Sequence, residues 1–253
     1  MSPPGLSIEK VKKVFLSVEK KEIVALDEVS LFAPQGRITS IVGPTGSGKT
    51  TLLRIVASLE RPDSGEVRFS FEGNGPSPSI GYVTQHHNLF PWYTIRKNIS
   101  LPMTLRGVQD REAEKRTEEI CKTLGLEEVS ELYPYEVSGG MQQRAAIGRV
   151  LASDATLWLM DEPFSSVDEK TRHRLQNLLI ELVKDRGITV LFVTHSIDEA
   201  VYLSDRIVIL SCSPGRVVDN FDITLERPRD RFSRAYSEIL ERVRINIEEV
   251  LRE

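Results

Sequence analysis

The sequence has few cysteines and no long apolar run. Its two cysteines, Cys121 and Cys212, are too few for a disulfide framework and indicate a reducing compartment. No uninterrupted apolar stretch approaches the ~18 residues that a membrane-spanning helix requires. The opening residues, MSPPGLSIEK, lack the basic and then apolar pattern of a secretory signal. We therefore expect a cytoplasmic chain that does not itself cross a bilayer.

The sequence also lacks an excess of positive charge. It contains 33 Lys and Arg residues against 37 Asp and Glu residues, for a formal net charge of −4 at pH 7. Affinity for nucleic acid in general depends on a basic surface that releases counterions, so the composition predicts no nucleic-acid partner, although it leaves room for a local basic patch. With 40% hydrophobic and 28% charged residues, the 253-residue chain has the composition of a globular protein with a proper core.

Short β-rich apolar segments alternate with longer segments of helical period along the chain. This alternation is typical of a mostly parallel sheet flanked by helices. The chain ends in an amphipathic segment, whose apolar stripe we expect to pack on its own domain rather than on a partner. The predicted strands are 38–42, 80–83, 156–160, 189–193 and 206–210, the predicted helices are 49–59, 141–152 and 170–184, and turns are expected at 3–4 and 73–78.

Residues 86–151 interrupt this alternation, because they read as loop and helix without a convincing strand. They could form a helical insertion into the sheet domain. They could equally form one long crossover between two strands, and the pattern alone favours neither.

The first motif that carries chemistry follows the apolar segment 38–42 and matches the pattern GxxxxGK[ST]. Its glycines let backbone N–H groups converge on an anion, and the helix that follows adds the positive end of its dipole. Lys49 is then expected to bridge the β- and γ-phosphates of a nucleotide, and the Thr50 hydroxyl to bind Mg²⁺. The predicted nucleotide site comprises Gly43, Pro44, Thr45, Gly46, Ser47, Gly48, Lys49, Thr50 and Thr51.

The apolar segment 156–160 ends in two carboxylates, Asp161 and Glu162. In P-loop proteins an acid at a strand end holds magnesium, often through water, and Asp161 is the candidate for that role. Glu162 is placed to orient and polarise the attacking water as a general base or hydrogen-bond acceptor. If the sequence had no P-loop, we would interpret Asp161 and Glu162 as part of a solvated acidic turn.

A third motif, VSGGMQQR at 137–144, opens a helical segment with Ser138 at the N-cap position. A serine hydroxyl, flexible glycines and a helix N-terminus together form a second anion site. With the P-loop and the Asp-Glu pair, this motif resembles the LSGGQ signature of ABC ATPases. Val137 replaces the usual Leu, and Met141 replaces the usual Gln. These departures bear on affinity and coupling, but they leave the serine and the glycines in place.

The resemblance implies the ABC ATPase fold, an α/β P-loop NTPase with a mostly parallel sheet core, an N-terminal antiparallel β subdomain and an inserted helical subdomain. It implies a head-to-tail dimer with a second ATPase subunit, in which Ser138, Gly139 and Gly140 close on ATP held by the opposite P-loop. On this basis residues 1–253 form a single ABC ATPase domain. Its expected parts are a nucleotide-binding core (about 1–85 and 155–230), a helical subdomain (about 86–154) and a C-terminal amphipathic helix (about 231–253).

Other landmarks of the family follow in order. Gln85 matches the Q-loop glutamine, which in the family senses Mg²⁺ and the attacking water and moves with the transmembrane partner. Asp168 ends a segment that resembles the D-loop at the dimer interface. His195 matches the switch histidine that contacts the γ-phosphate.

Several side chains near these landmarks have two interpretations. Phe15 fits the aromatic A-loop that stacks on adenine, or a place in the hydrophobic core. Trp92 fits the surface that receives a coupling helix of the permease, or the interior of the helical subdomain. His86 and His87 match no landmark, and we expect them to be ordinary loop residues.

The local sequences LFPWYTI, DEPFSSVD, THSIDEAVYLSDR and SPGR are similar to the nitrate, sulfonate and taurine import family. This similarity implies an ATP- and Mg²⁺-dependent importer subunit at the cytoplasmic face of the cell membrane, with transmembrane permease subunits and, indirectly, a solute-binding protein as partners. The solute stays open, because an ATPase subunit does not contact it.

Three alternatives compete with this interpretation. An exporter ATPase shares the same motifs, so import and export are not separated by these residues alone. Chromosome-maintenance and DNA-repair relatives carry a long coiled-coil arm before the signature, and this chain has no heptad run that could form one. A P-loop kinase or GTPase would leave the residues from Ser138 to Gly140, and His195, without a role.

Overall fold

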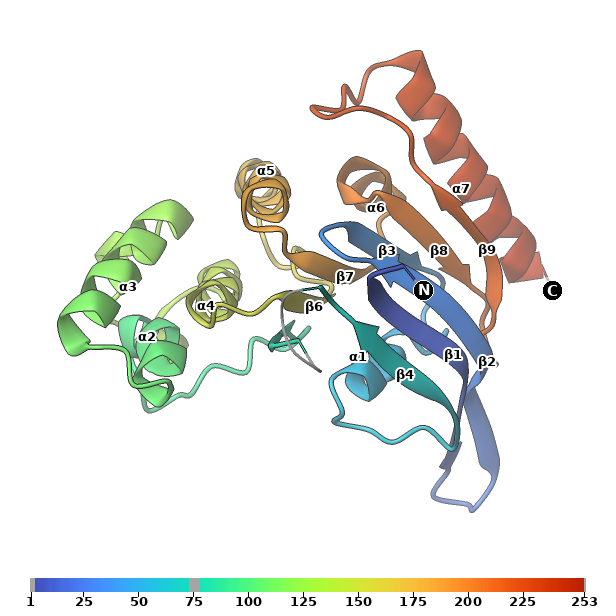
Figure 1. Cartoon of the computed structure of the whole chain (residues 1–253), viewed down its shortest axis with the longest axis horizontal. Helices are drawn as coiled ribbons and strands as arrows, with labels where there is room; N and C mark the ends of the chain where they lie inside the picture. The colour runs from blue at the N-terminus through green and yellow to red at the C-terminus, as the bar shows by residue number, and fades with distance from the viewer. Residues whose placement is uncertain (1–2, 73–77, 253) are drawn as a thin grey trace. The chain divides into compact units, whose positions relative to one another are not determined.

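The computed structural model describes residues 3–72 and 78–252, so most of the turn expected at 73–78 lies outside the described residues. The contacts divide the chain into two compact units. Unit 1 comprises Met1–Pro78 and Leu182–Glu253, and unit 2 comprises Ser79–Glu181. Figure 1 labels the helices and strands of both units. The expected boundaries of a nucleotide-binding core and a helical subdomain at 86–154 stay predictions.

Unit 1 contains an antiparallel sheet of three strands in the order β2-β1-β4. The second half of β2 alternates between exposed and buried side chains, as expected of a strand with one face on a core. Leu26, Val29 and Ala33 form part of that buried face. The predicted N-terminal antiparallel sheet is therefore present, with β1 at Gly5–Leu16, β2 at Glu22–Pro34 and β4 at Ser64–Ser70.

The second sheet region of unit 1 is built around β3, which pairs in parallel with β7 on one side and β8 on the other. Both β3 and β7 are buried along their whole length, which explains their continuous apolar sequences. Strand β9, which the sequence did not predict, pairs antiparallel with β8. The elements of this region are β3 (Ile38–Val42), α1 (Lys49–Val56), β7 (Thr189–Thr194), α6 (Ile197–Leu203), β8 (Arg206–Leu210) and β9 (Val217–Asp222).

The C-terminal helix α7 (Arg234–Arg252) packs on unit 1, as its apolar stripe predicted. Figure 1 shows it beside β9. Tyr236 and Val243 are buried in a cluster with residues of α6 and β8. The Tyr236 hydroxyl donates hydrogen bonds to the Asp198 carboxylate at 2.7 Å and to the Asp198 carbonyl at 3.0 Å. Burial and this carboxylate raise the pKa of Tyr236 well above its ordinary value.

We expect Tyr236→Phe to lower the free energy of unfolding by about 1 kcal/mol, because the substitution removes these hydrogen bonds without removing the buried ring. Denaturant unfolding of the full chain measures the change. Phe232→Ala is the control, since Phe232 is 97% exposed and its loss is expected to change stability by less than about 0.5 kcal/mol. Equal stability of Tyr236→Phe and the unmodified chain would contradict the prediction.

Unit 2 combines one pair of parallel strands, β5 and β6, with a group of helices. Residues 86–151, which the structure describes throughout, contain helices and no strand, as predicted. Thr94 begins α2 by accepting a hydrogen bond from the Lys97 N–H, and Gly125 ends α3 in the left-handed conformation with φ 62°. The elements are β5 (Ile80–Val83), α2 (Ile95–Leu105), α3 (Asp110–Leu124), α4 (Gly139–Ala152), β6 (Leu157–Asp161) and most of α5 (Glu169–Arg186), with 3₁₀ turns at Glu127–Val129 and Pro134–Glu136.

Candidate functional site

The P-loop follows the carboxyl end of β3 and leads into α1. The strand register places Val42 beside Thr194 of β7 and Ile209 of β8, so the loop begins at an edge shared by three parallel strands. Gly48 lies at the N-cap of α1 with φ 81°, a left-handed conformation that glycine adopts without the cost of a Cβ. The predicted strand, loop and helix are therefore all present.

At two glycines the surrounding backbone lies so close that there is no room for a Cβ. A Cβ at Gly43 would lie 2.6 Å from the Leu210 carbonyl oxygen, and a Cβ at Gly215 would lie 2.2 Å from the Ser47 carbonyl oxygen. Gly215 is held there by β2, because its N–H donates to the Ala25 carbonyl at 3.1 Å and its carbonyl accepts from the Asp27 N–H at 2.9 Å. Gly215 thus fixes one side of the P-loop, a role that the sequence did not reveal.

Lys49 is only 8% exposed, and its ammonium group bonds to the loop itself. It donates to the carbonyl oxygens of Gly43 at 2.7 Å and Pro44 at 2.8 Å, and to the Ser47 hydroxyl at 3.2 Å. A buried cation within a turn of glycines beside a helix N-terminus fits the phosphates of a nucleotide. Of the other residues in the predicted loop, Gly43 and Ser47 are buried, Pro44, Gly48 and Thr51 are half-buried, and Thr45, Gly46 and Thr50 are exposed.

Phe15 lies near the end of β1, opposite Ile23 of β2. Its ring is 38% exposed, and the Lys13 ammonium lies 5.2 Å from the ring centroid. The alternative of a place in the hydrophobic core is therefore wrong. An exposed ring is available to stack on a base, and the adenine-binding role of Phe15 stays a prediction.

His195 follows β7 directly and is exposed. The backbone around it is fixed, because the Thr194 hydroxyl donates to the buried Glu199 carboxylate at 2.7 Å and the Ser196 N–H donates to the Thr194 hydroxyl at 3.0 Å. The Ser196 hydroxyl in turn accepts from the Glu199 N–H at 3.3 Å and caps α6. Glu199 therefore positions the segment that carries His195. The S-x-x-E spacing of a capping box could have indicated it.

We expect Gly215→Ala to weaken ATP binding about tenfold or more, since the added methyl group would displace the Ser47 carbonyl and overpacking of this kind costs on the order of 1–3 kcal/mol. Equilibrium titration of the full chain with ATP measures the effect.

Gly107→Ala is a control for this substitution, because a Cβ there would meet nothing within 4 Å, so the alanine is strained only by the positive φ of 72°, which Gly215 does not have. It should lose some stability and keep its affinity for ATP. Unchanged ATP affinity in Gly215→Ala would refute the steric argument.

In unit 2 the two carboxylates lie at the carboxyl end of β6. Val83 of β5 is paired with Met160, so Gln85 and Asp161 follow neighbouring ends of parallel strands. Asp161 is 2% exposed, whereas Gln85 is exposed. Glu162 has φ 47°, a backbone conformation that is costly for a non-glycine residue. Its carbonyl accepts from the Ser165 N–H at 3.2 Å and hydroxyl at 3.0 Å, which stabilises the turn.

Ser138 is the N-cap of α4, as predicted, and its hydroxyl accepts from the Met141 N–H at 3.3 Å. Ser138 and Gly139 are exposed at the start of the helix. Gly140 lies against the 165–168 segment, where a Cβ would approach the Ser166 carbonyl to 3.0 Å. The signature turn and the D-loop segment of one chain are thus in direct backbone contact.

Asp168 caps the other helix that starts here. Its carboxylate accepts from the Thr171 N–H at 3.0 Å, and this hydrogen bond is the main reason why the pKa of Asp168 lies below its ordinary value. A contact of Asp168 across a dimer interface stays a prediction.

Trp92 belongs to an aromatic group just before α2. Its ring centroid lies 5.4 Å from that of Phe90 and 6.3 Å from that of Tyr93. Trp92 is 66% exposed, so the alternative of a buried position inside the helical region is wrong. An exposed aromatic cluster is the kind of surface that anchors a protein partner.

Comparison with known proteins identifies the family. Residues 26–165, more than half of the chain, match the family described as ABC transporter. The chain belongs to this ABC transporter family. It is 43% identical over 98% of its length, and 93% of the other, to an uncharacterised ABC transporter ATP-binding protein of Methanocaldococcus jannaschii. It is 38% identical over 94% of both chains to an aliphatic sulfonates import ATP-binding protein of Bacillus cereus.

A related sulfonates import ATP-binding protein of Burkholderia cenocepacia is 40% identical over 91% of this chain and 83% of its own. The fold is that of the ATP-binding cassette MJ0796 in a dimeric post-hydrolysis state bound to ADP and Pi, with TM-score 0.78 and 32% identity over 87% of this chain and 100% of that one. The predicted ABC ATPase fold is confirmed. The chain is therefore an ATP-binding, ATP-hydrolysing ABC transporter subunit.

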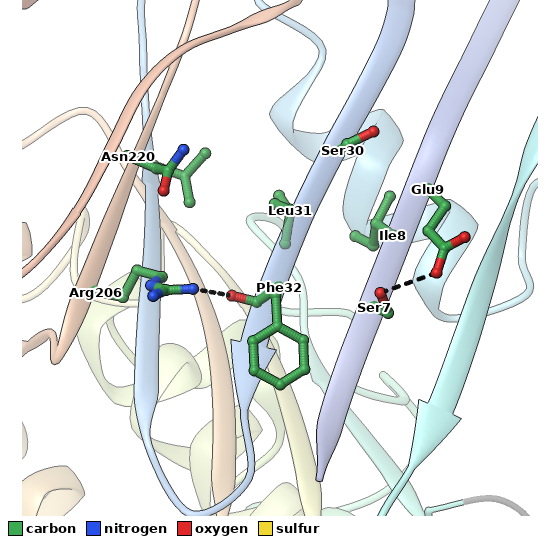
Figure 2. A pocket seen from close by; sticks show the side chains of 9 residues that line it. Ser7, Ile8, Glu9, Ser30, Leu31, Phe32, Arg206 and Asn220 are labelled. Carbon is green, nitrogen blue, oxygen red and sulfur yellow. Dashed lines mark hydrogen bonds between the residues drawn. The ribbon is translucent and has the colours of Figure 1, made fainter. Parts of the chain in front are cut away.

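One open pocket of this ABC cassette, of about 330 Å³, lies apart from the P-loop (Figure 2). It sits at the start of β8, near Arg206, whereas the end of β8 touches the P-loop. Arg206 donates to the Phe32 carbonyl at 3.3 Å, and the Ser7 hydroxyl donates to Glu9 at 3.3 Å. Because the pocket lies at the opposite end of β8 from the P-loop, we assign it no part in ATP binding.

The structure gathers the predicted site residues of the cassette into two groups. Unit 1 holds the P-loop, Phe15 and His195, and unit 2 holds Gln85, Asp161, Glu162, the signature and Asp168. Sequence reasoning missed Gly215 and Glu199. His87, which we expected to be an ordinary loop residue, lies with its Nε2 3.4 Å from the Ser166 hydroxyl of the D-loop segment.

Proposed function

We propose that this ABC ATPase energises the uptake of a small solute of the nitrate, sulfonate or taurine class through partner permease subunits. The observation that carries the proposal is likeness over nearly the whole chain to proteins named as aliphatic sulfonates import ATP-binding proteins, at 38% and 40% identity. The exposed aromatic group around Trp92 supports a protein partner at the surface of unit 2.

In this proposal the P-loop binds the triphosphate through its backbone N–H groups. Lys49 exchanges its bonds to the loop carbonyls for bonds to the β- and γ-phosphates, which are stronger because both partners are charged. Thr50 and Asp161 would supply oxygen ligands for Mg²⁺, the donor type that this ion prefers. When bound, Mg²⁺ would neutralise charge that develops during phosphoryl transfer. Phe15 would stack on the adenine.

Glu162 would accept a hydrogen bond from the attacking water and align it with the γ-phosphorus. Its strained backbone supports this role, because the turn fixes where the carboxylate begins. His195 would donate a hydrogen bond to the γ-phosphate from a segment that Glu199 holds in place. Gln85 would contact Mg²⁺ and the water.

The proposed working form is a dimer with a second ATPase subunit. Ser138, Gly139 and Gly140 would bind the γ-phosphate held by the partner P-loop, with Asp168 at the same interface. The exposed helix N-terminus and the solved dimers of a cassette 32% identical to this one support the arrangement. ATP binding would favour the closed dimer and hydrolysis would release it.

We expect Glu162→Gln to keep ATP affinity within about twofold, to lower steady-state hydrolysis by at least about 100-fold, and to accumulate dimer in the presence of Mg-ATP. Phosphate release and analytical ultracentrifugation measure these quantities. Lys49→Ala is the matched control, since it should lose ATP binding itself. Hydrolysis by Glu162→Gln at the unmodified rate would refute the assignment.

Transport of a solute requires subunits that cross the membrane. Among the described residues, none of the helices combines the length and the apolarity that a membrane span needs. We place the subunit at the cytoplasmic face of the cell membrane, bound to transmembrane permease subunits that receive solute from a solute-binding protein. Trp92 and its aromatic neighbours are the proposed contact with the permease.

We expect the tagged full-length chain, purified from its own host in mild detergent, to copurify with permease subunits, and Trp92→Ala to lose them while keeping its ATP affinity. Mass spectrometry identifies the captured proteins. In reconstituted vesicles, a sulfonate-loaded solute-binding protein should stimulate hydrolysis, while the same protein without solute should not. Stimulation by a substrate offered only from the ATPase side would indicate an exporter and contradict the proposal.

A further inference from the structure

His87 lies between three functional segments of unit 2. It comes two positions after Gln85, and its Nε2 lies 3.4 Å from the hydroxyl of Ser166 in the D-loop segment. A Cβ built at Gly139, in the signature turn, would be in ordinary contact with the His87 ring at 3.8 Å. The imidazole is half-buried at this meeting point. His86, its neighbour, is exposed.

The turn that carries His87 is held by its own hydrogen bonds. The Thr84 hydroxyl donates to the His86 carbonyl at 2.5 Å, and the Asn88 amide donates to the Thr84 hydroxyl at 2.9 Å. Arg149 of α4 donates to the Asn88 carbonyl at 2.8 Å. These bonds tie both ends of the turn, so a displacement of the Gln85 segment would be transmitted to the His87 ring.

Ser166 contacts two of the segments at once. Its hydroxyl faces His87, and its carbonyl oxygen lies so close to Gly140 that a Cβ there would approach it to 3.0 Å. The imidazole of His87 is suited to this contact because burial, and then the charge of His86, lower its pKa below the ordinary value. A neutral ring can donate to, or accept from, the serine hydroxyl.

We propose that His87 is a positioning residue for ATP hydrolysis, which holds the D-loop and the signature turn in register with the segment that follows Gln85. This role rests on the proposed place of the signature and the D-loop at the ATP-bearing dimer interface. In this role His87 would contact neither ATP nor the attacking water. It acts through Ser166 and Gly139, whose alignment decides how well the interface fits the transition state.

The proposal predicts an effect on turnover rather than on ATP binding. The contacts of His87 lie within unit 2, and the P-loop that binds the triphosphate belongs to unit 1. His87→Ala should therefore lower kcat about three- to tenfold, as expected when one ordinary hydrogen bond that matters in the transition state is lost, with KM for ATP changed less than about twofold.

Two conservative substitutions sharpen the test. In His87→Gln the side-chain amide extends to the ε position, where the imidazole Nε2 lies, so this variant should restore most of the kcat. In His87→Asn the amide ends at the δ position, one atom short, and should behave like His87→Ala. His86→Ala is the neighbouring control and should keep the unmodified kcat. Ser166→Ala should match His87→Ala, and the double variant should fall no further than the lower single variant.

The measurement is steady-state hydrolysis of Mg-ATP by the full chain, with kcat and KM for each variant and its thermal midpoint. The expected result is that His87→Gln restores kcat and His87→Asn does not, and that the effects of His87→Ala and Ser166→Ala on kcat are not additive. Equal kcat in all His87 variants would overturn the proposal. So would a kcat in His87→Gln that is as low as in His87→Ala, or an effect of His87→Ala that appears as a higher KM instead of a lower kcat. Failure of the proposed function would look different, because the unmodified chain would then show no hydrolysis that depends on Glu162.

Discussion

The close approach of three backbone segments around the P-loop is the constraint on which the nucleotide site depends. Residues from β2, from the loop itself and from the turn after β8 meet at distances that leave no room for a Cβ at Gly43, Gly48 or Gly215. Backbone packed this tightly has little freedom to move, so its N–H groups keep their direction without support from long side chains. An anion cradle built from backbone needs this rigidity, because flexible donors would lose entropy on binding.

The parallel strands add a second constraint, which explains where the candidate site residues lie in each unit. A buried strand can carry few polar groups, whereas the residue that follows its carboxyl end leaves the core. In unit 1 the register of β3 and β7 puts the start of the P-loop next to His195. In unit 2 the register of β5 and β6 puts Gln85 and Asp161 at neighbouring strand ends. Apolar strand sequences and the candidate site residues at the strand ends are therefore parts of one pattern.

This pattern explains how much the sequence could predict. The predicted strands are present with bounds that differ by one residue at most, and Ser138 is the N-cap that its helix required, because these features depend on local sequence. Strand β9 was missed because its half-buried alternation is short and it includes Asp219, Asn220 and Asp222, residues that are rare in strands.

The residues that the sequence did not reveal act over long separations in the chain. Gly215 matters because it lies against Ser47, and His87 because it lies against Ser166. Nothing in the local sequence indicates such contacts, since they arise only when strands and loops are placed beside one another. Glu199 is an intermediate case, because its helix-capping spacing is local but its bond to Thr194 orients a residue outside the helix.

Lys49 connects these constraints with ATP binding. An ammonium group that is 8% exposed would be costly to bury without partners, and the loop supplies two carbonyls and a hydroxyl. Phosphate oxygens carry a negative charge that these two carbonyls and this hydroxyl lack, so in the proposed function they form stronger hydrogen bonds with the same ammonium donors. ATP binding then exchanges hydrogen-bond partners at the Lys49 ammonium, which is already withdrawn from water. The cost of desolvating this ammonium has been met by folding. The rigid packing around Gly43 and Gly215 therefore contributes to ATP affinity through the position of Lys49 as well as through the backbone N–H groups.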